Sequence, residues 1–129
     1  MITVDRLFEV PDHQLKNYPN STMFVTKTAG IWVPIATSDF IDRTMTVARG
    51  LISMGVQAGD RVAVASSNRL EWNILDIAVQ KVGAILVPLY PTISESDYRY
   101  ILNDAAAKIC IVSNQELADK ISNIRADVS

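Results

Sequence analysis

Near the middle of the chain, Asp60-Arg61-Val62-Ala63-Val64-Ala65-Ser66 decides the fold class. Its centre, residues 62–65, is apolar on both faces of an extended strand, which is typical of a parallel sheet covered on both sides. Two more apolar runs follow, at residues 84–89 and 109–112, and each run precedes a stretch with helical spacing. This order predicts an α/β fold with a mainly parallel sheet, right-handed crossovers and helices on both faces.

Each of the three helices after these strands begins with a capping candidate three positions before a carboxylate. The pairs are Asn68 with Glu71, Ser94 with Asp97, and Ser113 with Glu116. The first and last fit a capping box well, whereas Asp97 is a shorter substitute for the usual Glu or Gln. The helix from about Leu70 to Val82 is apolar around nearly its whole circumference, so it should be buried on more than one side.

Upstream of the parallel sheet, residues 1–22 predict an irregular arm with one short helix. Apolar runs at residues 23–27 and 31–35 flank Ala29-Gly30, which predicts a β-hairpin. A helix should follow to about Met54, with cap candidates at Thr37, Ser38 and Asp39. The expected organisation is therefore an arm, 1–22, and an α/β subdomain, 23–129.

The composition excludes several classes of protein. Apolar residues make up 49% and charged residues 20% of the 129 positions, which favours a soluble globular domain. The net charge is −2 and the basic residues are scattered, so nucleic acid is not expected as a partner. No apolar run is long enough to span a bilayer, and the first ten residues lack the pattern of a secretory signal. The single cysteine, Cys110, lies in an apolar run and favours a core position and a cytosolic compartment.

No residue of the sequence is assigned a catalytic, cofactor-binding or metal-binding role. No two of the five glycines are close enough to form a phosphate-binding loop, and Gly55 and Gly59 fit the connection from a helix to a strand. The only histidine, His13, lies in the arm beside Asp12 and is interpreted as a surface residue. No serine stands in the context of a nucleophile elbow.

Polar and aromatic residues follow each of the three strands, at the edge where ligands bind in open parallel sheets. These segments are Ser66-Ser67-Asn68, Tyr90-Pro91-Thr92 and Ser113-Asn114. The favoured interpretation is structural. Asn68, Ser94 and Ser113 would cap helices, and residues 90–92 would form a turn.

Taken together, several segments carry a resemblance to a known family. They are Gly59-Asp60-Arg61-Val62-Ala63-Val64, Asn68-Arg69-Leu70-Glu71-Trp72, Gly83-Ala84-Ile85-Leu86-Val87-Pro88-Leu89-Tyr90-Pro91-Thr92 and Tyr100-Ile101-Leu102-Asn103-Asp104, with Trp32-Val33-Pro34-Ile35 and Ala48-Arg49-Gly50-Leu51 upstream. Over about residues 23–112 the chain resembles the acyl-CoA synthetases of the adenylate-forming, AMP-binding superfamily. Residues 88–92 are most similar to long-chain fatty acid–CoA ligases, and a luciferase-like enzyme or an aryl-CoA ligase stays open.

The resemblance implies a reaction in two steps. ATP and a fatty acid give an acyl-adenylate, and CoA then displaces AMP, with magnesium in the first step. The phosphate-binding Ser/Thr/Gly-rich loop of that family would lie downstream, so the chain is expected to be an amino-terminal fragment that is inactive alone. Asp60, Arg61, Gly83 and Pro88 then have structural roles.

The expected partners are the remainder of a parent chain and, for that parent, fatty acid, ATP and CoA. The apolar girth of the helix at residues 70–82 also predicts self-association. A cytoplasmic location is expected, with peripheral membrane contact left open. The alternative is a stand-alone α/β module that uses the same fold for binding or interaction.

Overall fold

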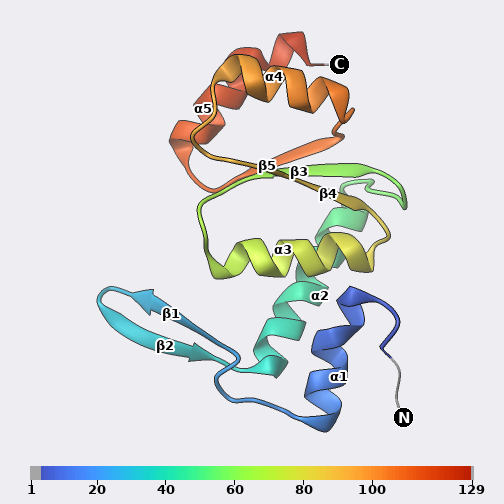
Figure 1. The fold of residues 1–129 in the computed structure, drawn as a ribbon, viewed down its shortest axis with the longest axis vertical. Coiled ribbons are helices and arrows are strands. Elements are labelled where there is room, and N and C mark those ends of the chain that lie inside the picture. The colour runs from blue at the N-terminus through green and yellow to red at the C-terminus, as the bar shows by residue number, and fades with distance from the viewer. Residues whose placement is uncertain (1–3, 129) are drawn as a thin grey trace.

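Three parallel strands form the centre of the fold, and helices cover both of their faces (Figure 1). The computed structural model describes residues 4–128, so residues 1–3 of the expected arm and Ser129 lie outside it. In chain order the elements are η1 (Leu7–Glu9), α1 (Val10–Asn17), β1 (Phe24–Thr28), β2 (Ile31–Ile35), α2 (Thr37–Ser53), β3 (Arg61–Ala65), α3 (Leu70–Lys81), β4 (Ile85–Leu89), α4 (Glu95–Asp104), β5 (Ile109–Val112), α5 (Gln115–Ile124) and η2 (Arg125–Asp127). The predicted α/β fold is confirmed.

The sheet has the order β4-β3-β5, and both pairs of strands are parallel. Val62 lies opposite Leu86 on one side and opposite Ile109 on the other. Because β3 is central and covered on both faces, its residues 62–65 are all buried. This burial explains why the run is apolar without alternation.

Alternate residues of β3 serve two separate cores. Val62 and Val64 pack with α2 and α3, whereas Ala63 and Ala65 pack with α4 and α5. Side chains of a strand point to opposite faces in turn, so one short strand can join both layers.

Helix α3 lies between the sheet and α2 (Figure 1), as its apolar circumference predicted. Leu75, Ala78 and Val79 face the sheet, while Leu70 and Ile74 join a third cluster with residues of α2. The apolar residues around α3 are therefore covered by other parts of the chain. Self-association was predicted from an exposed apolar surface on this helix, and α3 does not provide such a surface.

The β-hairpin is confirmed, and it extends away from the body of the molecule (Figure 1). Its two-residue turn has φ of 49° at Ala29 and 83° at Gly30, the signs that a type I′ turn requires at both positions. The base of the hairpin is fixed by Phe24, whose ring centroid lies 5.1 Å from that of Phe40 in α2.

Of the three predicted capping boxes, only the one at Ser94 forms. Ser94 Oγ accepts a hydrogen bond from the Asp97 backbone N–H, and Asp97 Oδ2 accepts one from the Ser94 N–H. The predicted caps at Asn68 and Ser113 were wrong. Helices α3 and α5 each start one residue later than a capping box at those positions requires. Arg69 precedes α3 without a side-chain cap, and Asn114 caps α5 by accepting from the Leu117 N–H at 2.9 Å.

The cap candidates of α2 were also wrong. Its N-cap is Ala36, so Thr37, Ser38 and Asp39 fall inside the first turn. Thr37 is buried, and its hydroxyl bonds to the backbone of Asn20, which fixes the segment before the hairpin to the start of α2.

The structural roles expected of Arg61 and Gly83 have clear physical causes. Arg61 donates to the carbonyl oxygens of Ala105 and Ala106, at 2.7 and 3.1 Å, and so satisfies the carboxyl end of α4. Gly83 has a φ of 76° in the turn from α3 to β4. Gly55 and Gly59 also have positive φ in the connection from α2 to β3, as predicted.

Helix α1 is the one short helix expected before the hairpin. It contacts α2, and an ion pair joins Asp12 to Lys81 of α3. Within residues 4–128, no helix combines the length and the apolar character that crossing a membrane requires.

Candidate functional site

The carboxyl ends of β3, β4 and β5 meet at one edge of the sheet, which we call the carboxyl edge. Because the strands are parallel, the loops at residues 66–69, 90–94 and 113–114 all begin there. This is the edge where open α/β sheets bind ligands.

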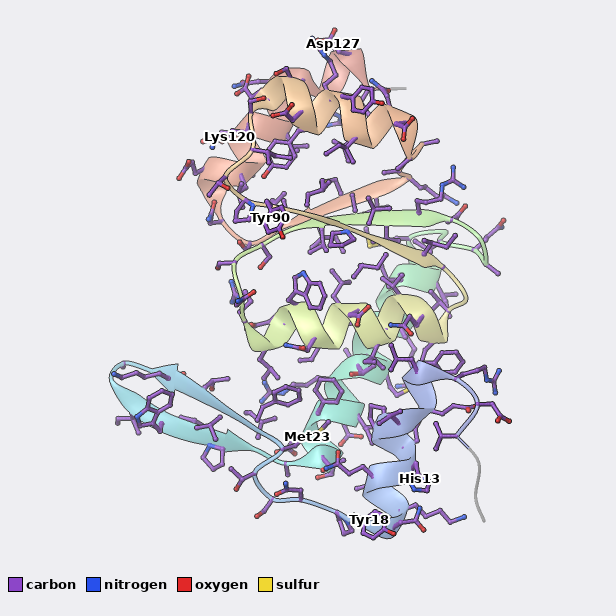
Figure 2. All side chains as sticks on the ribbon, viewed as in Figure 1. His13, Tyr18, Met23, Tyr90, Lys120 and Asp127 are labelled. Carbon is purple, nitrogen blue, oxygen red and sulfur yellow. The ribbon has the colours of Figure 1, made fainter. Side chains whose placement is uncertain are left out.

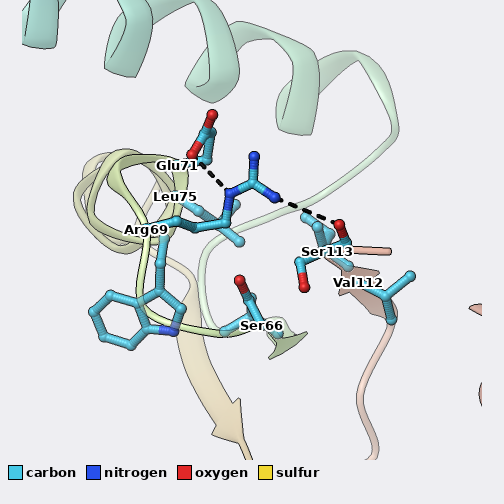
Figure 3. Close-up of a pocket in the computed structure, with 9 residues that line it drawn as sticks. Ser66, Arg69, Glu71, Leu75, Val112 and Ser113 are labelled. Atoms are coloured by element: carbon cyan, nitrogen blue, oxygen red, sulfur yellow. Dashed lines mark hydrogen bonds and ion pairs between the residues drawn. The ribbon is translucent and has the colours of Figure 1, made fainter. Parts of the chain in front are cut away.

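A pocket of about 240 Å³ lies at the carboxyl edge, between the ends of β3 and β5 and the first turns of α3 (Figure 3). We call it the Ser113 pocket. Its walls are mainly apolar and its mouth is polar. The lining residues are Val64, Ser66, Arg69, Glu71, Trp72, Leu75, Ile111, Val112 and Ser113.

Arg69 spans the mouth of the Ser113 pocket (Figure 3). Its Nε donates to Glu71 Oε2 at 2.8 Å, and its Nη1 reaches the carbonyl oxygen of Ser113 at 3.4 Å. The hydrogen bond from Arg69 lowers the pKa of Glu71, and the charge of Arg43 on α2 acts in the same direction. Glu71 is therefore ionised at neutral pH and forms an ion pair with Arg69.

The side chain of Ser113 has an unusual environment. Its backbone is fixed, because the Ser113 N–H donates to the Ala65 carbonyl at 3.1 Å and continues the ladder of the sheet. Its Oγ, however, is buried without a hydrogen-bond partner, and it is the only buried side-chain polar atom in that condition among residues 4–128. A buried polar atom without a partner costs free energy, because its hydrogen bonds to water have been lost.

A second pocket, of about 490 Å³, shares Ser66 and Trp72 with the Ser113 pocket. It extends over the segment after β4, and its lining residues are Ser66, Ser67, Asn68, Trp72, Pro88, Leu89, Tyr90 and Pro91. Tyr90 is 79% exposed at its border (Figure 2). The Tyr98 hydroxyl donates to the Tyr90 carbonyl at 2.7 Å and so holds this segment from beneath.

Neither the single histidine nor the single cysteine lines the pockets at the carboxyl edge. No group of three His, Cys, Asp or Glu side chains within residues 4–128 is arranged to hold a metal ion. His13 lies on α1, away from the sheet (Figure 2). Cys110 is half-buried and packs with the α4 and α5 core, and burial raises the pKa of its thiol to about 11, so the thiol is neutral.

The structure therefore brings the three segments that follow the strands together at the carboxyl edge. The contacts that their residues make differ from the predicted ones. The turn at residues 90–92 precedes Ser94 as expected. Arg69, Glu71 and Trp72 line the Ser113 pocket, and no ligand-facing role was predicted for them. Their position at the start of a helix that follows a buried strand was the available signal.

Comparison with known proteins gives a consistent result. The family described as AMP-binding enzyme matches residues 11–129. The chain is 34% identical over 110 residues to the long-chain-fatty-acid–CoA ligase FadD15 of Mycobacterium tuberculosis, and this match covers 85% of the chain and 18% of FadD15. The chain thus spans less than a fifth of that relative.

Two other similarities extend the comparison. The uncharacterized protein Rv1549 of Mycobacterium tuberculosis is 31% identical over 83 residues, which cover 64% of this chain and 47% of that protein. A crystal structure of a proposed long-chain-fatty-acid CoA ligase from Rhodopseudomonas palustris superposes with a TM-score of 0.81 at 27% identity, over 95% of this chain and 30% of that one.

Proposed function

The chain belongs to the AMP-binding enzyme family, and on that premise we propose that it forms the first α/β part of a long-chain fatty acid–CoA ligase. The observation that carries this proposal is the family match over residues 11–129, which includes the whole parallel sheet. The similarity to FadD15 supports the fatty acid as the substrate class.

The proposed ligase activates a fatty acid with ATP as an acyl-adenylate, releases pyrophosphate, and transfers the acyl group to CoA with loss of AMP. Magnesium would neutralise phosphate charge in the first step. Among the described residues, no three His, Cys, Asp or Glu side chains are grouped to hold that ion, and Arg69 is paired with Glu71. We therefore derive no step through magnesium from the carboxyl edge.

In this proposal the present residues act as a scaffold. Arg61 and Tyr98 fix the loops around the parallel sheet, and the catalytic groups come from other parts of a longer chain. The 129 residues alone would not form acyl-adenylate, because catalysis needs several groups held around one reacting centre.

The sequence of the gene beyond Ser129 tests the proposal most directly. A ligase requires a downstream loop rich in Ser, Thr and Gly that ends near a Lys. The longer protein should release pyrophosphate from ATP only when fatty acid is present, and should then form acyl-CoA. For the 129-residue chain, we expect no saturable heat when ATP and Mg²⁺ are titrated into it in a calorimeter. Micromolar binding by that chain would contradict the scaffold role.

A second candidate function is a stand-alone binding module. It is favoured by the match to Rv1549, in which a similar segment makes up nearly half of the protein. A stop codon directly after Ser129 would support the module, whereas a downstream phosphate-binding loop would support the ligase. Cytoplasmic location is proposed for either form.

A further inference from the structure

We propose that the cleft between β1 and the start of α3 binds an extended acidic segment of a partner protein, which adds a third strand to the hairpin along the outer edge of β1. We call it the β1 cleft. Its volume is about 600 Å³, and β1 is the strand of the hairpin that lies nearer α3 (Figure 1). The proposal uses only this part of the chain, so it does not depend on the proposed function.

The lining of the β1 cleft shows which part of the hairpin borders it. Every residue from Val25 to Thr28 lines the cleft, whereas β2 contributes only Val33 and Ile35. Consecutive residues of a strand point to opposite faces, so a surface that touches all of them runs along the edge of that strand. The cleft therefore follows the outer edge of β1, and residues 67–71 form its opposite wall.

The outer edge of β1 carries backbone groups that are free to pair. Val25 lies opposite Pro34, and Lys27 lies opposite Trp32. Proline has no N–H, so Val25 and Pro34 cannot exchange two hydrogen bonds, and the two kinds of pair alternate along an antiparallel ladder. The N–H and C=O groups of Val25 and Lys27 therefore point away from β2. Outside the hairpin, no backbone hydrogen bond joins them to the rest of residues 4–128.

The outer edge of β2 is less suited to pairing. Its outward positions are Trp32 and Pro34, and Pro34 provides no donor. A proline on an edge strand hinders the addition of another strand. The complete set of donors and acceptors is therefore on β1, at the edge that borders the cleft.

The charges around the β1 cleft favour an acidic strand. Lys27, Arg43 and Arg69 line it, against one carboxylate, that of Glu71. Arg69 is paired with Glu71 at 2.8 Å. Arg43 is exposed and joins none of the ion pairs within residues 4–128, and Lys27 Nζ lies 5.4 Å from the centre of the Trp32 ring. Lys27 and Arg43 can therefore pair with carboxylates of an added strand, and opposite charges stabilise cross-strand pairs.

A second copy of the chain does not provide such a strand. Residues 23–35 contain no Asp or Glu, so the hairpin of a second copy would bring another Lys27 to the cleft and no carboxylate. Like charges on neighbouring strands are destabilising. The acidic strand must come from a different protein.

A short capped peptide of alternating Thr and Glu residues is the probe. It is titrated into the ¹⁵N-labelled 129-residue chain, below the concentration at which the chain self-associates, while NMR follows the backbone N–H groups. The signals of Val25 and Lys27 should shift in a saturable way and become protected from hydrogen exchange. The backbone N–H of Trp32, on the opposite edge, should stay unprotected.

Two altered peptides separate the backbone contribution from that of charge. The same peptide N-methylated along its backbone cannot donate hydrogen bonds and should not bind. The peptide with Gln in place of Glu keeps the backbone and should bind about two to five times more weakly, which is the contribution of an exposed ion pair.

Variants of the chain test the same two contributions. Val25→Pro removes the outward N–H of β1, as Pro34 does on β2, and should weaken the Glu peptide about tenfold or more. Arg43→Gln should weaken the Glu peptide about two- to fivefold and leave the Gln peptide unchanged. Arg49→Gln is the control, because Arg49 is exposed on the same helix but does not line the cleft. Each variant must first give the dispersed spectrum of a folded chain.

Four results would overturn the proposal. They are shifts that never saturate, protection of Trp32 instead of Val25 and Lys27, binding of the N-methylated peptide, and equal affinity for the Glu and Gln peptides. The last two need no variant, so they decide the matter even if Val25→Pro does not fold.

Discussion

At the scale of single residues, Tyr98 connects the core to the carboxyl edge. Its side chain is fully buried, and its hydroxyl donates to the Tyr90 carbonyl. Tyr98→Phe should lower the free energy of unfolding by about 1 kcal/mol, because the ring still fills its site and only the hydrogen bond is lost. Urea denaturation measures this change. Tyr100→Phe, on the exposed face of α4, is the matched control and should have no measurable effect.

The ion pair between Asp60 and Lys108 predicts that the stability of the fold depends on pH. Lys108 Nζ lies 2.7 Å from Asp60 Oδ2, and this hydrogen bond, followed by one from the Gln57 N–H, lowers the pKa of Asp60. A carboxyl whose pKa is lower in the folded state stabilises the fold above the unfolded pKa, about 3.9, and this contribution disappears as the pH falls through the folded pKa. Stability should therefore fall on acidification.

Asp60→Asn and Lys108→Gln should each make the urea midpoint less dependent on pH below about pH 4. Both variants should keep part of the acid sensitivity of the unchanged chain, because the pKa values of Glu9 and Glu71 are lowered by their own arginine partners. If the midpoints of the variants follow the same pH curve as the unchanged chain, the Asp60–Lys108 pair does not stabilise the fold.

At the scale of secondary-structure elements, two glycines allow a matched comparison. Gly83 has a φ of 76°, and a Cβ built there would lie 3.1 Å from Ala58 Cβ, so Gly83→Ala should destabilise the chain by about 1–2 kcal/mol. Gly50 lies inside α2 with open space around it, and Gly50→Ala should stabilise by roughly 0.5–1 kcal/mol. Thermal unfolding should give opposite shifts, and equal effects would contradict this interpretation.

The starts of the helices show how far the sequence predicts this fold. Strands, helices and their order follow from apolar spacing, because burial on two faces leaves a strong pattern in β3 and α3. Caps depend on one residue, and Ser113-Asn114 offers two capping side chains in succession. Which of them caps α5 depends on where the backbone leaves β5, and tertiary pairing of Ser113 with Ala65 determines that position.

The candidate site was less predictable for the same reason. A shift of one residue turns Ser113 from a helix cap into a pocket residue whose hydroxyl has no partner. The pairing of Arg69 with Glu71 depends on the same shift, since Glu71 was expected to bond to Asn68 and instead accepts from Arg69. Local pattern alone could place these residues at the carboxyl edge but could not assign their contacts.

At the scale of the whole molecule, the exposed apolar surface of the β-hairpin predicts self-association. The register pairs Val25 with Pro34 and Lys27 with Trp32, so these side chains share one face, and Ile31 lies at the tip. Trp32 is 65% exposed and Ile31 is 68% exposed. Apolar side chains grouped on a projecting two-stranded sheet, whose edges are unpaired, favour contact with another protein surface.

Sedimentation at high concentration should therefore show a weight-average mass that rises with concentration. Trp32→Thr keeps a residue suited to a strand but removes the largest exposed ring, and it should weaken association about tenfold or more, as expected for a tryptophan at the centre of an interface. Tyr100→Gln, which removes an exposed ring from α4, should leave association unchanged. A sharp monomer at all concentrations would show that the hairpin face does not pair with a second copy. Association that survives Trp32→Thr would instead favour the free edges of β4 and β5, where backbone groups rather than the indole would make the contact.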